Sequence, residues 1–226
     1  MTEPTGRETG YALWDWPVRL IHWAIVLILP ASWWTAEEGY FTVHQWLGLT
    51  VLVLVLTRIC WGFLGSPQAR FRDFLRGPRA VLAYFRGEPS TTPGHNPAGG
   101  WSVMVLWSLL LMQALTGTVS SDDVMFEGPF YYVFDSGIAD ALAEIHEVLF
   151  KGILAFVALH VGTVIWYERR RDQRLLKPMI LGRSAGREGT GPAQPLYKAI
   201  VIALLLAGLL WGLMELAPEP PPAFYW

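Results

Sequence analysis

The chain has 226 residues, of which 53% are apolar and 16% are charged. Soluble domains usually carry about 25% charged residues, so this composition argues against a soluble protein and favours one that spans a membrane. The net charge of −2 says little about partners, and we expect no nucleic-acid ligand. Cys60 is the only cysteine, which excludes an intrachain disulfide.

Five apolar runs are long enough to cross the ~30 Å hydrocarbon core of a bilayer as helices. The polar N-terminus ahead of the first run has no apolar core of a signal peptide, so we expect that run to remain as a span. The last run contains Gly208 and Gly212, a GxxxG spacing that lets helices pack closely. The predicted spans are residues 17–36, 43–64, 101–121, 139–168 and 195–216.

Basic residues are distributed unevenly among the connections between these spans. Arginine is frequent between the second and third spans and again after the fourth, whereas the other two connections and the C-terminal tail contain no Lys or Arg. Positively charged connections stay on the cytoplasmic side of a membrane. We therefore expect a multi-pass protein of the bacterial inner membrane, with its N-terminus in the cytoplasm and its C-terminus in the periplasm.

Four of the five histidines fall at two depths in the predicted spans. His146 and His160 are fourteen residues apart in the fourth span, so they share one helix face and are separated by about 21 Å. His44 begins the second span at the outer side, and His22 lies near the inner start of the first. This placement predicts an outer pair, His44/His146, and an inner pair, His22/His160.

Paired imidazoles in apolar helices are typical of the axial ligands of non-covalent b-type haem. Ionisable residues inside a membrane are costly and are usually functional. A zinc site normally needs four ligands, which neither depth offers, and the CxxCH motif that attaches c-type haem is absent. We therefore predict two b haems. The alternative is a haem-free transporter or assembly subunit in which the histidines relay protons.

Other residues near these depths are candidates for contact with a haem. Arg58 follows His44 by fourteen residues, so it faces the inner site and is expected to hold a propionate; Arg19 is a second candidate for that role. Gly48 and Gly117 would let a porphyrin approach the helix backbone. The alternatives are arginines that extend to the lipid headgroups and glycines that only pack helices.

Several stretches together resemble the bacterial cytochrome b561 family, which is grouped with the b-type cytochrome subunits of nickel-iron hydrogenases. They are WDWPVRLIHW, HQWLGLTVLVLVLTRICWGFLG, ARFRDFLRGPRAVLAYFRG, GHNPAGGWS and HEVLFKGILAFVALHVGTVIW. The resemblance covers about residues 11–183. It implies an all-α integral membrane four-helix bundle that holds two b haems, with ligands at the same four histidines. Residues 184–226 depart from it and are expected to form a linker and one additional C-terminal transmembrane helix.

Three further residues have roles that the sequence leaves open. His95 and Asn96 belong to the GHNPAGG motif on the cytoplasmic side, where they would hydrogen-bond a propionate, line a quinone pocket in the case of His95, or simply order the loop. Lys151 either extends outward to the headgroups or meets an outer propionate.

The function implied is electron transfer between the quinone pool and a periplasmic redox partner such as a cytochrome c or a hydrogenase. The alternative with the same fold is a quinone reductase linked to superoxide or another small molecule. The outer loop carries acidic residues, which would guide a basic protein and repel superoxide. The fifth span is either an extra anchor or a docking helix for a second copy or another subunit. The acidic residues are Asp122, Asp123, Glu127 and Asp135.

Overall fold

The computed structural model describes residues 10–89, 92, 94–122, 126–170, 173–184 and 186–219. Within these ranges the chain is helical, with isolated bridges and no strands. Five helices are long and apolar enough to cross a membrane, which confirms the five predicted spans. They are α1 (Trp16–Glu37), α2 (Phe41–Leu64), α5 (Pro97–Gly117), α6 (Ser136–Arg170) and α8 (Leu196–Glu215).

Two of the spans begin with the same local signal, a capping side chain followed by proline. Asp15 accepts a hydrogen bond from the backbone N–H of Val18 at 3.0 Å, and Asn96 accepts one from Gly99 at 2.7 Å. A capping oxygen satisfies one of the N–H groups that have no partner in the first turn of a helix. For this reason α5 begins at Pro97, four residues before the start predicted from hydropathy.

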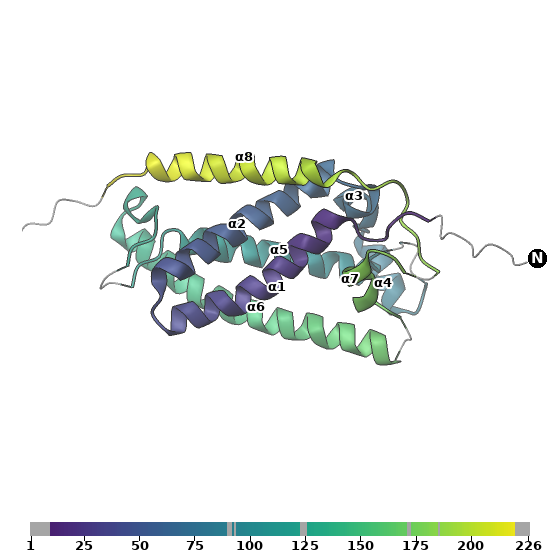
Figure 1. The fold of residues 1–226 in the computed structure, drawn as a ribbon. Coiled ribbons are helices and arrows are strands. Elements are labelled where there is room, and N and C mark those ends of the chain that lie inside the picture. Colours follow the sequence, from purple (N-terminus) through teal and green to yellow (C-terminus); the bar gives the residue numbers. More distant parts are fainter. Residues whose placement is uncertain are drawn as a thin grey trace, which may run out of the picture.

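The helices pack in a chain of neighbours, α1 on α2, α2 on α5 and α5 on α6, with α8 along the outside of α2 (Figure 1). Side chains from α1, α2, α5 and α6 meet in one buried cluster at the middle of the molecule. An all-α membrane bundle is therefore confirmed. The cluster consists of Ile21, Ile25, Val51, Leu52, Val55, Leu110, Ala114 and Ile153.

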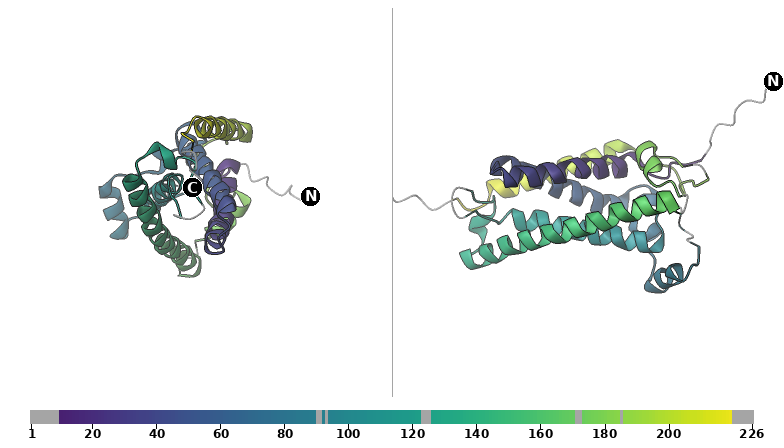
Figure 2. Two further views of the ribbon diagram at one scale, coloured as in Figure 1. Left: turned by 90° about the vertical axis from the view of Figure 1, so that its left-hand side faces the viewer. Right: turned by 90° about the horizontal axis from the view of Figure 1, so that it is seen from below.

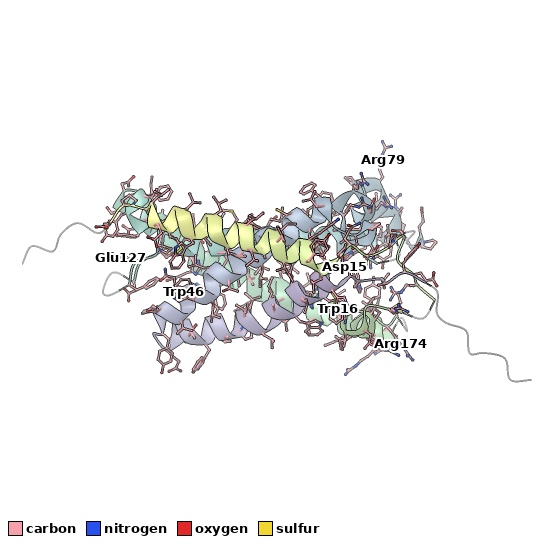
Figure 3. The ribbon with its side chains drawn as sticks, turned by 45° about the horizontal axis from the view of Figure 1, so that its top comes forward. Asp15, Trp16, Trp46, Arg79, Glu127 and Arg174 are labelled. Atoms are coloured by element: carbon pink, nitrogen blue, oxygen red, sulfur yellow. The ribbon has the colours of Figure 1, made fainter. Side chains whose placement is uncertain are left out.

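The two ends of the bundle differ in charge, as the sequence predicts. We call the end with the α2–α5 and α6–α8 connections the basic end, and the end with the α1–α2 and α5–α6 connections the acidic end. The basic end contains three short helices, α3 (Phe71–Phe74), α4 (Pro78–Phe85) and α7 (Leu176–Leu181), and the 3-10 turn η1 (Pro67–Ala69). Among the described residues, the acidic end has the 3-10 turn η2 (Tyr131–Val133). Figure 3 shows Glu127 at the acidic end and Arg79 and Arg174 at the basic end.

The fifth span is packed on the bundle. The rings of Trp46 on α2 and Trp211 on α8 stack with centroids 6.2 Å apart and planes inclined by 18°. At the basic end, Ala199 is buried in a second cluster that includes Trp61 of α2. Residues 184–226 were predicted as a linker and a separate helix, and this packing ties the helix to α2.

Candidate functional site

The outer pair of histidines comes together at the acidic end. The rings of His44 on α2 and His146 on α6 have centroids 6.2 Å apart and planes inclined by 85°. A metal–imidazole bond is about 2 Å long, so two imidazoles on opposite sides of one metal ion have centroids about 6 Å apart. The observed separation therefore fits a single metal ion between the two rings.

Both outer imidazoles are oriented by backbone carbonyls. His44 donates from Nδ1 to the carbonyl of Ser32 at 2.8 Å, and His146 donates from Nδ1 to the carbonyl of Gln113 at 2.9 Å. Because a carbonyl only accepts, these contacts place the proton on Nδ1 and leave the Nε2 lone pair available. Metal-binding histidines are usually held in this way by a second hydrogen bond.

The sequence analysis missed the polar partners that α5 supplies to His146. The Gln113 side-chain amide lies 3.0 Å from His146 Nε2, and Thr116 Oγ1 lies 3.2 Å from Nδ1. A metal ion on Nε2 would take the lone pair that now faces this amide. The sequence contained a signal for these partners. Gln113 and Thr116 are polar residues three positions apart in an apolar span, so they lie on one side of the helix.

The two glycines of the outer site differ in their surroundings. A Cβ atom at Gly117 would lie 2.7 Å from Cε1 of His146, so the missing side chain makes room for the imidazole itself. A Cβ atom at Gly48 would meet nothing within 4 Å. Haem contact stays a prediction for both Gly48 and Gly117. Only Gly48 has open space beside it. Lys151 is exposed on α6, five residues after His146 and about 140° away around the helix.

The inner pair, His22 and His160, lies toward the basic end. Both imidazoles are partly buried, and their pairing stays a prediction. His22 Nδ1 is buried without a hydrogen-bond partner. An unsatisfied buried nitrogen costs free energy, and a bound ligand that accepts its proton or uses its lone pair would remove that cost.

Arg58 is buried in α2, and its predicted place at the inner site stays a prediction. Its side chain is 2% exposed, and its guanidinium carbon lies 5.5 Å from the Phe71 ring and 6.0 Å from the Trp107 ring. Nη2 donates to the carbonyl of Ala69 at 3.2 Å, while Nη1 is buried without a partner. A buried cation with an unused donor fits an anionic acceptor such as a propionate.

The two loop residues are brought to the same end. His95 is held between the rings of Trp14 and Phe74, each with its centroid 4.7 Å away, and its Nδ1 is buried without a partner. Burial, together with the charges of Arg58 and His160, lowers the pKa of His95 to about 3. His95 is therefore neutral at physiological pH. Asn96 already uses its side-chain oxygen to cap α5, which leaves its amide group for any ligand.

Arg19 lies next to α7. Its Nε donates to the carbonyl of Met179 at 3.3 Å, its Nη2 donates to the carbonyl of Ile180, and the guanidinium lies 4.4 Å from the Trp16 ring centroid. The last carbonyls of a helix have no partner within it, so a cation there is stabilising. Nη1 of Arg19 takes part in neither of these hydrogen bonds, so the propionate contact of Arg19 stays a prediction.

Comparison with known proteins agrees with this arrangement. A family model described as prokaryotic cytochrome b561 matches residues 13–182. The chain belongs to the prokaryotic cytochrome b561 family. As a member of this family, it is a multi-pass membrane protein whose fold is associated with b-type haem and membrane electron transfer. The resemblance seen in the sequence motifs is thus confirmed.

A curated relative of this cytochrome b561 family protein is named "Probable Ni/Fe-hydrogenase B-type cytochrome subunit" and comes from Bradyrhizobium diazoefficiens. The two chains are 25% identical over 222 residues, covering 81% of this chain and 89% of the relative. No solved structure matched the chain. The family match ends at Gly182, directly after α7, and does not include α8.

Proposed function

We propose that this cytochrome b561 family protein carries electrons between the quinone pool and a periplasmic redox protein through two b haems. The observation that carries the proposal is the outer pair, in which His44 and His146 lie at a separation suited to one metal ion and each donates from Nδ1 to a carbonyl. The haem supplies the one-electron chemistry when it is bound. The chain supplies ligands, low dielectric and charge compensation.

At the inner site, the chain's own contribution is mainly electrostatic. Arg58 and His95 lie near His160, and His95 is neutral, so Arg58 provides the positive charge for an anionic group there. The basic end faces the cytoplasm in this proposal because basic connections are retained on that side. The acidic end then faces the periplasm, where the partner docks.

The nature of the partner is inferred from the acidic end. Glu127 and Asp135 are exposed there, with Glu127 accepting a hydrogen bond from Tyr132 at 2.6 Å and Asp135 capping the start of α6. A negative surface favours a basic redox protein, such as a cytochrome c or a hydrogenase subunit, over superoxide. Asp123, part of the same predicted acidic loop, lies outside the described residues.

The geometry of the outer histidines fits the haem-free alternative, a proton relay, less well. A proton relay needs histidine nitrogens that alternately accept and donate, whereas His44 and His146 each direct Nδ1 at a carbonyl that can only accept. A quinone reductase linked to a small molecule would keep the haems and exchange only the periplasmic partner, so it remains the closer alternative.

The test is the haem content of the purified membrane protein. We expect two haems per chain and a reduced-minus-oxidised α-band, with one haem lost in His146→Ala and the other lost in His160→Ala. His95→Gln is the matched control and should keep both. A colourless preparation would sink the proposal in favour of the proton relay. Full haem content in both alanine variants would refute the pairing alone.

A further inference from the structure

The short helix α4 stands out to the side of the bundle at its basic end (Figure 2). At eight residues it is too short to cross a bilayer, and none of its residues is buried. It belongs to the connection between α2 and α5, so it lies near the level where these spans leave the membrane. A helix in this position meets either water or the surface of the lipid.

One side of α4 is attached to the protein. The Tyr84 hydroxyl hydrogen-bonds to the Tyr167 hydroxyl of α6. Just before the helix, the carbonyl of Arg76 accepts a hydrogen bond from Nε1 of Trp101 at 2.8 Å. These two contacts orient the helix, so the direction of its remaining side is set by the bundle.

The other side is apolar and exposed. Leu82 is 51% exposed and Phe85 is 73% exposed. At 100° per residue, these two side chains lie about 60° apart around the helix, and Arg79 and Arg86 lie about 40–60° beyond Leu82. An apolar sector with cations along its border is typical of a helix that lies in the membrane interface.

The arginines on this border, and Arg76 just before α4, have no ion-pair partner among the described residues. Among the described residues, the ion pairs at this end join Asp73 to Arg70 at 3.1 Å and to Arg72 at 3.6 Å. No ion pair is found for Arg76, Arg79 or Arg86 in the part of the chain that the structure describes. Their positive charge is therefore available to an external anion.

We propose that α4 and these three arginines form a binding surface for anionic phospholipid, with Leu82 and Phe85 in the acyl-chain region and the guanidinium groups on the headgroup phosphates. One layer of anionic phospholipid would supply both the negative charge that the arginines lack and an apolar environment for Leu82 and Phe85. Lipid binding would also steady the preceding helix α3, whose Phe74 contacts His95. This surface is separate from the haem ligands, so the proposal does not depend on the proposed function.

The first test measures depth in the bilayer. The full chain with Cys60→Ala is reconstituted into nanodiscs of phosphatidylcholine and phosphatidylglycerol, with a spin label at Leu82→Cys, Phe85→Cys or, as the control, Glu88→Cys. We expect the labels at positions 82 and 85 to be relaxed more by oxygen than by a water-soluble nickel complex, and the reverse at position 88. Aqueous exposure at position 85 overturns the proposal, as does shielding that appears only when two copies associate.

The second test measures charge selectivity without altering the apolar face. Spin-labelled phosphatidylglycerol and phosphatidylcholine are compared on the parent protein and on the triple variant Arg76→Gln, Arg79→Gln, Arg86→Gln. Each arginine near a headgroup layer contributes about a fivefold factor in affinity, so the triple variant should lose at least about fivefold in preference for phosphatidylglycerol.

The matched control removes charge from the opposite side of the same end. Arg174 lies away from Arg79 in Figure 3, and Lys177 is exposed on α7 nearby in the sequence. The variant Arg174→Gln, Lys177→Gln should retain most of the preference for phosphatidylglycerol. The control removes two charges and the test variant three, so an equal loss per charge removed would mean that general surface charge attracts the lipid, and the proposed site would be rejected.

Discussion

Nε1 of Trp61 donates a hydrogen bond to the carboxylate of Asp15 across 2.8 Å, and both side chains are buried, Trp61 at 0% and Asp15 at 2% exposure. The other carboxylate oxygen of Asp15 caps α1. This one contact joins the start of α1 to the end of α2 and places a negative charge near the buried Arg58.

Trp61→Phe should therefore destabilise the protein, because it leaves a buried carboxylate oxygen without its donor. The expected cost is about 1.5–3 kcal/mol, the range for hydrogen bonds to charged groups. Thermal unfolding in detergent, followed by loss of soluble protein, measures it. The control is Trp33→Phe, whose indole bonds to Glu37 at 3.1 Å on the exposed surface and should change little. Equal stability of the two variants would contradict the assignment.

Gly117→Ala should disturb the outer site, because the added Cβ would lie 2.7 Å from Cε1 of His146. We expect one of the two haems to be lost or its spectrum to shift, measured by the pyridine haemochrome assay and by electron paramagnetic resonance. Gly152→Ala is the control on α6, where a Cβ meets nothing within 4 Å. Gly48→Ala tests the predicted porphyrin contact separately, because the added Cβ meets nothing within 4 Å in the protein and would clash only with a bound porphyrin.

Arg58→Leu should lower the midpoint potential of the inner haem, because a nearby positive charge favours the reduced state. One unit charge several ångströms away, at an effective dielectric constant of about 20, shifts a potential by something on the order of tens of millivolts. A redox titration of the purified protein measures it, with Arg58→Lys as the charge-conserving control. No shift, or a shift confined to the outer haem, would refute the placement of Arg58.

His95 should make the protein sensitive to acid. Its pKa in the folded protein is about 3, below the ordinary value of 6.5, so the unfolded chain binds the proton first as the pH falls. The stability that depends on neutral His95 is fully present above pH 6.5 and is lost progressively between 6.5 and about 3. His95→Gln should flatten this part of the profile of melting temperature against pH. An unchanged slope would show that other groups cause the acid sensitivity.

Gly208→Ile with Gly212→Ile should weaken association while leaving the bundle intact. A Cβ at either glycine meets nothing within 4 Å of this chain, so these residues are not used in packing α8 on α2. If another helix docks there, bulky side chains prevent close approach. Size-exclusion chromatography with light scattering should show a smaller particle and an unchanged haem spectrum. Leu213→Ile is the control, because Leu213 is exposed on α8 and lies about 100–140° around the helix from the two glycines. An unchanged particle would make α8 only an anchor.

The sequence was sufficient to predict features that follow from helical periodicity and from the distribution of charged residues. The spacing of fourteen residues placed His146 and His160 on one face and predicted that Arg58 turns inward, where it is 2% exposed. The start of α5 was predicted four residues late, because Gly99 and Gly100 are only weakly apolar and the capping signal of Asn96 followed by proline was not used.

Contacts between distant segments could not be predicted in the same way. Arg19 meets carbonyls 160 and 161 residues away, and no local pattern indicates that it bonds to them rather than to the predicted propionate. Nor could the sequence show which side of α8 faces α2, because lipid and protein interior are equally apolar and leave no periodic signal. The stacking of Trp46 on Trp211 settles that orientation.

The hydrogen bonds from Leu13 and Trp14 to the carbonyl of Gly182, at 2.8 and 3.2 Å, have a consequence for the order of assembly. The segment just before the first span is tied to a residue that the ribosome adds about 170 positions later. Residues 10–14 therefore cannot form these hydrogen bonds until the first four spans have been synthesised. The acidic end, whose α1–α2 connection is complete early, is free to take shape first, so the basic end closes last, during synthesis of the segment that leads to α8.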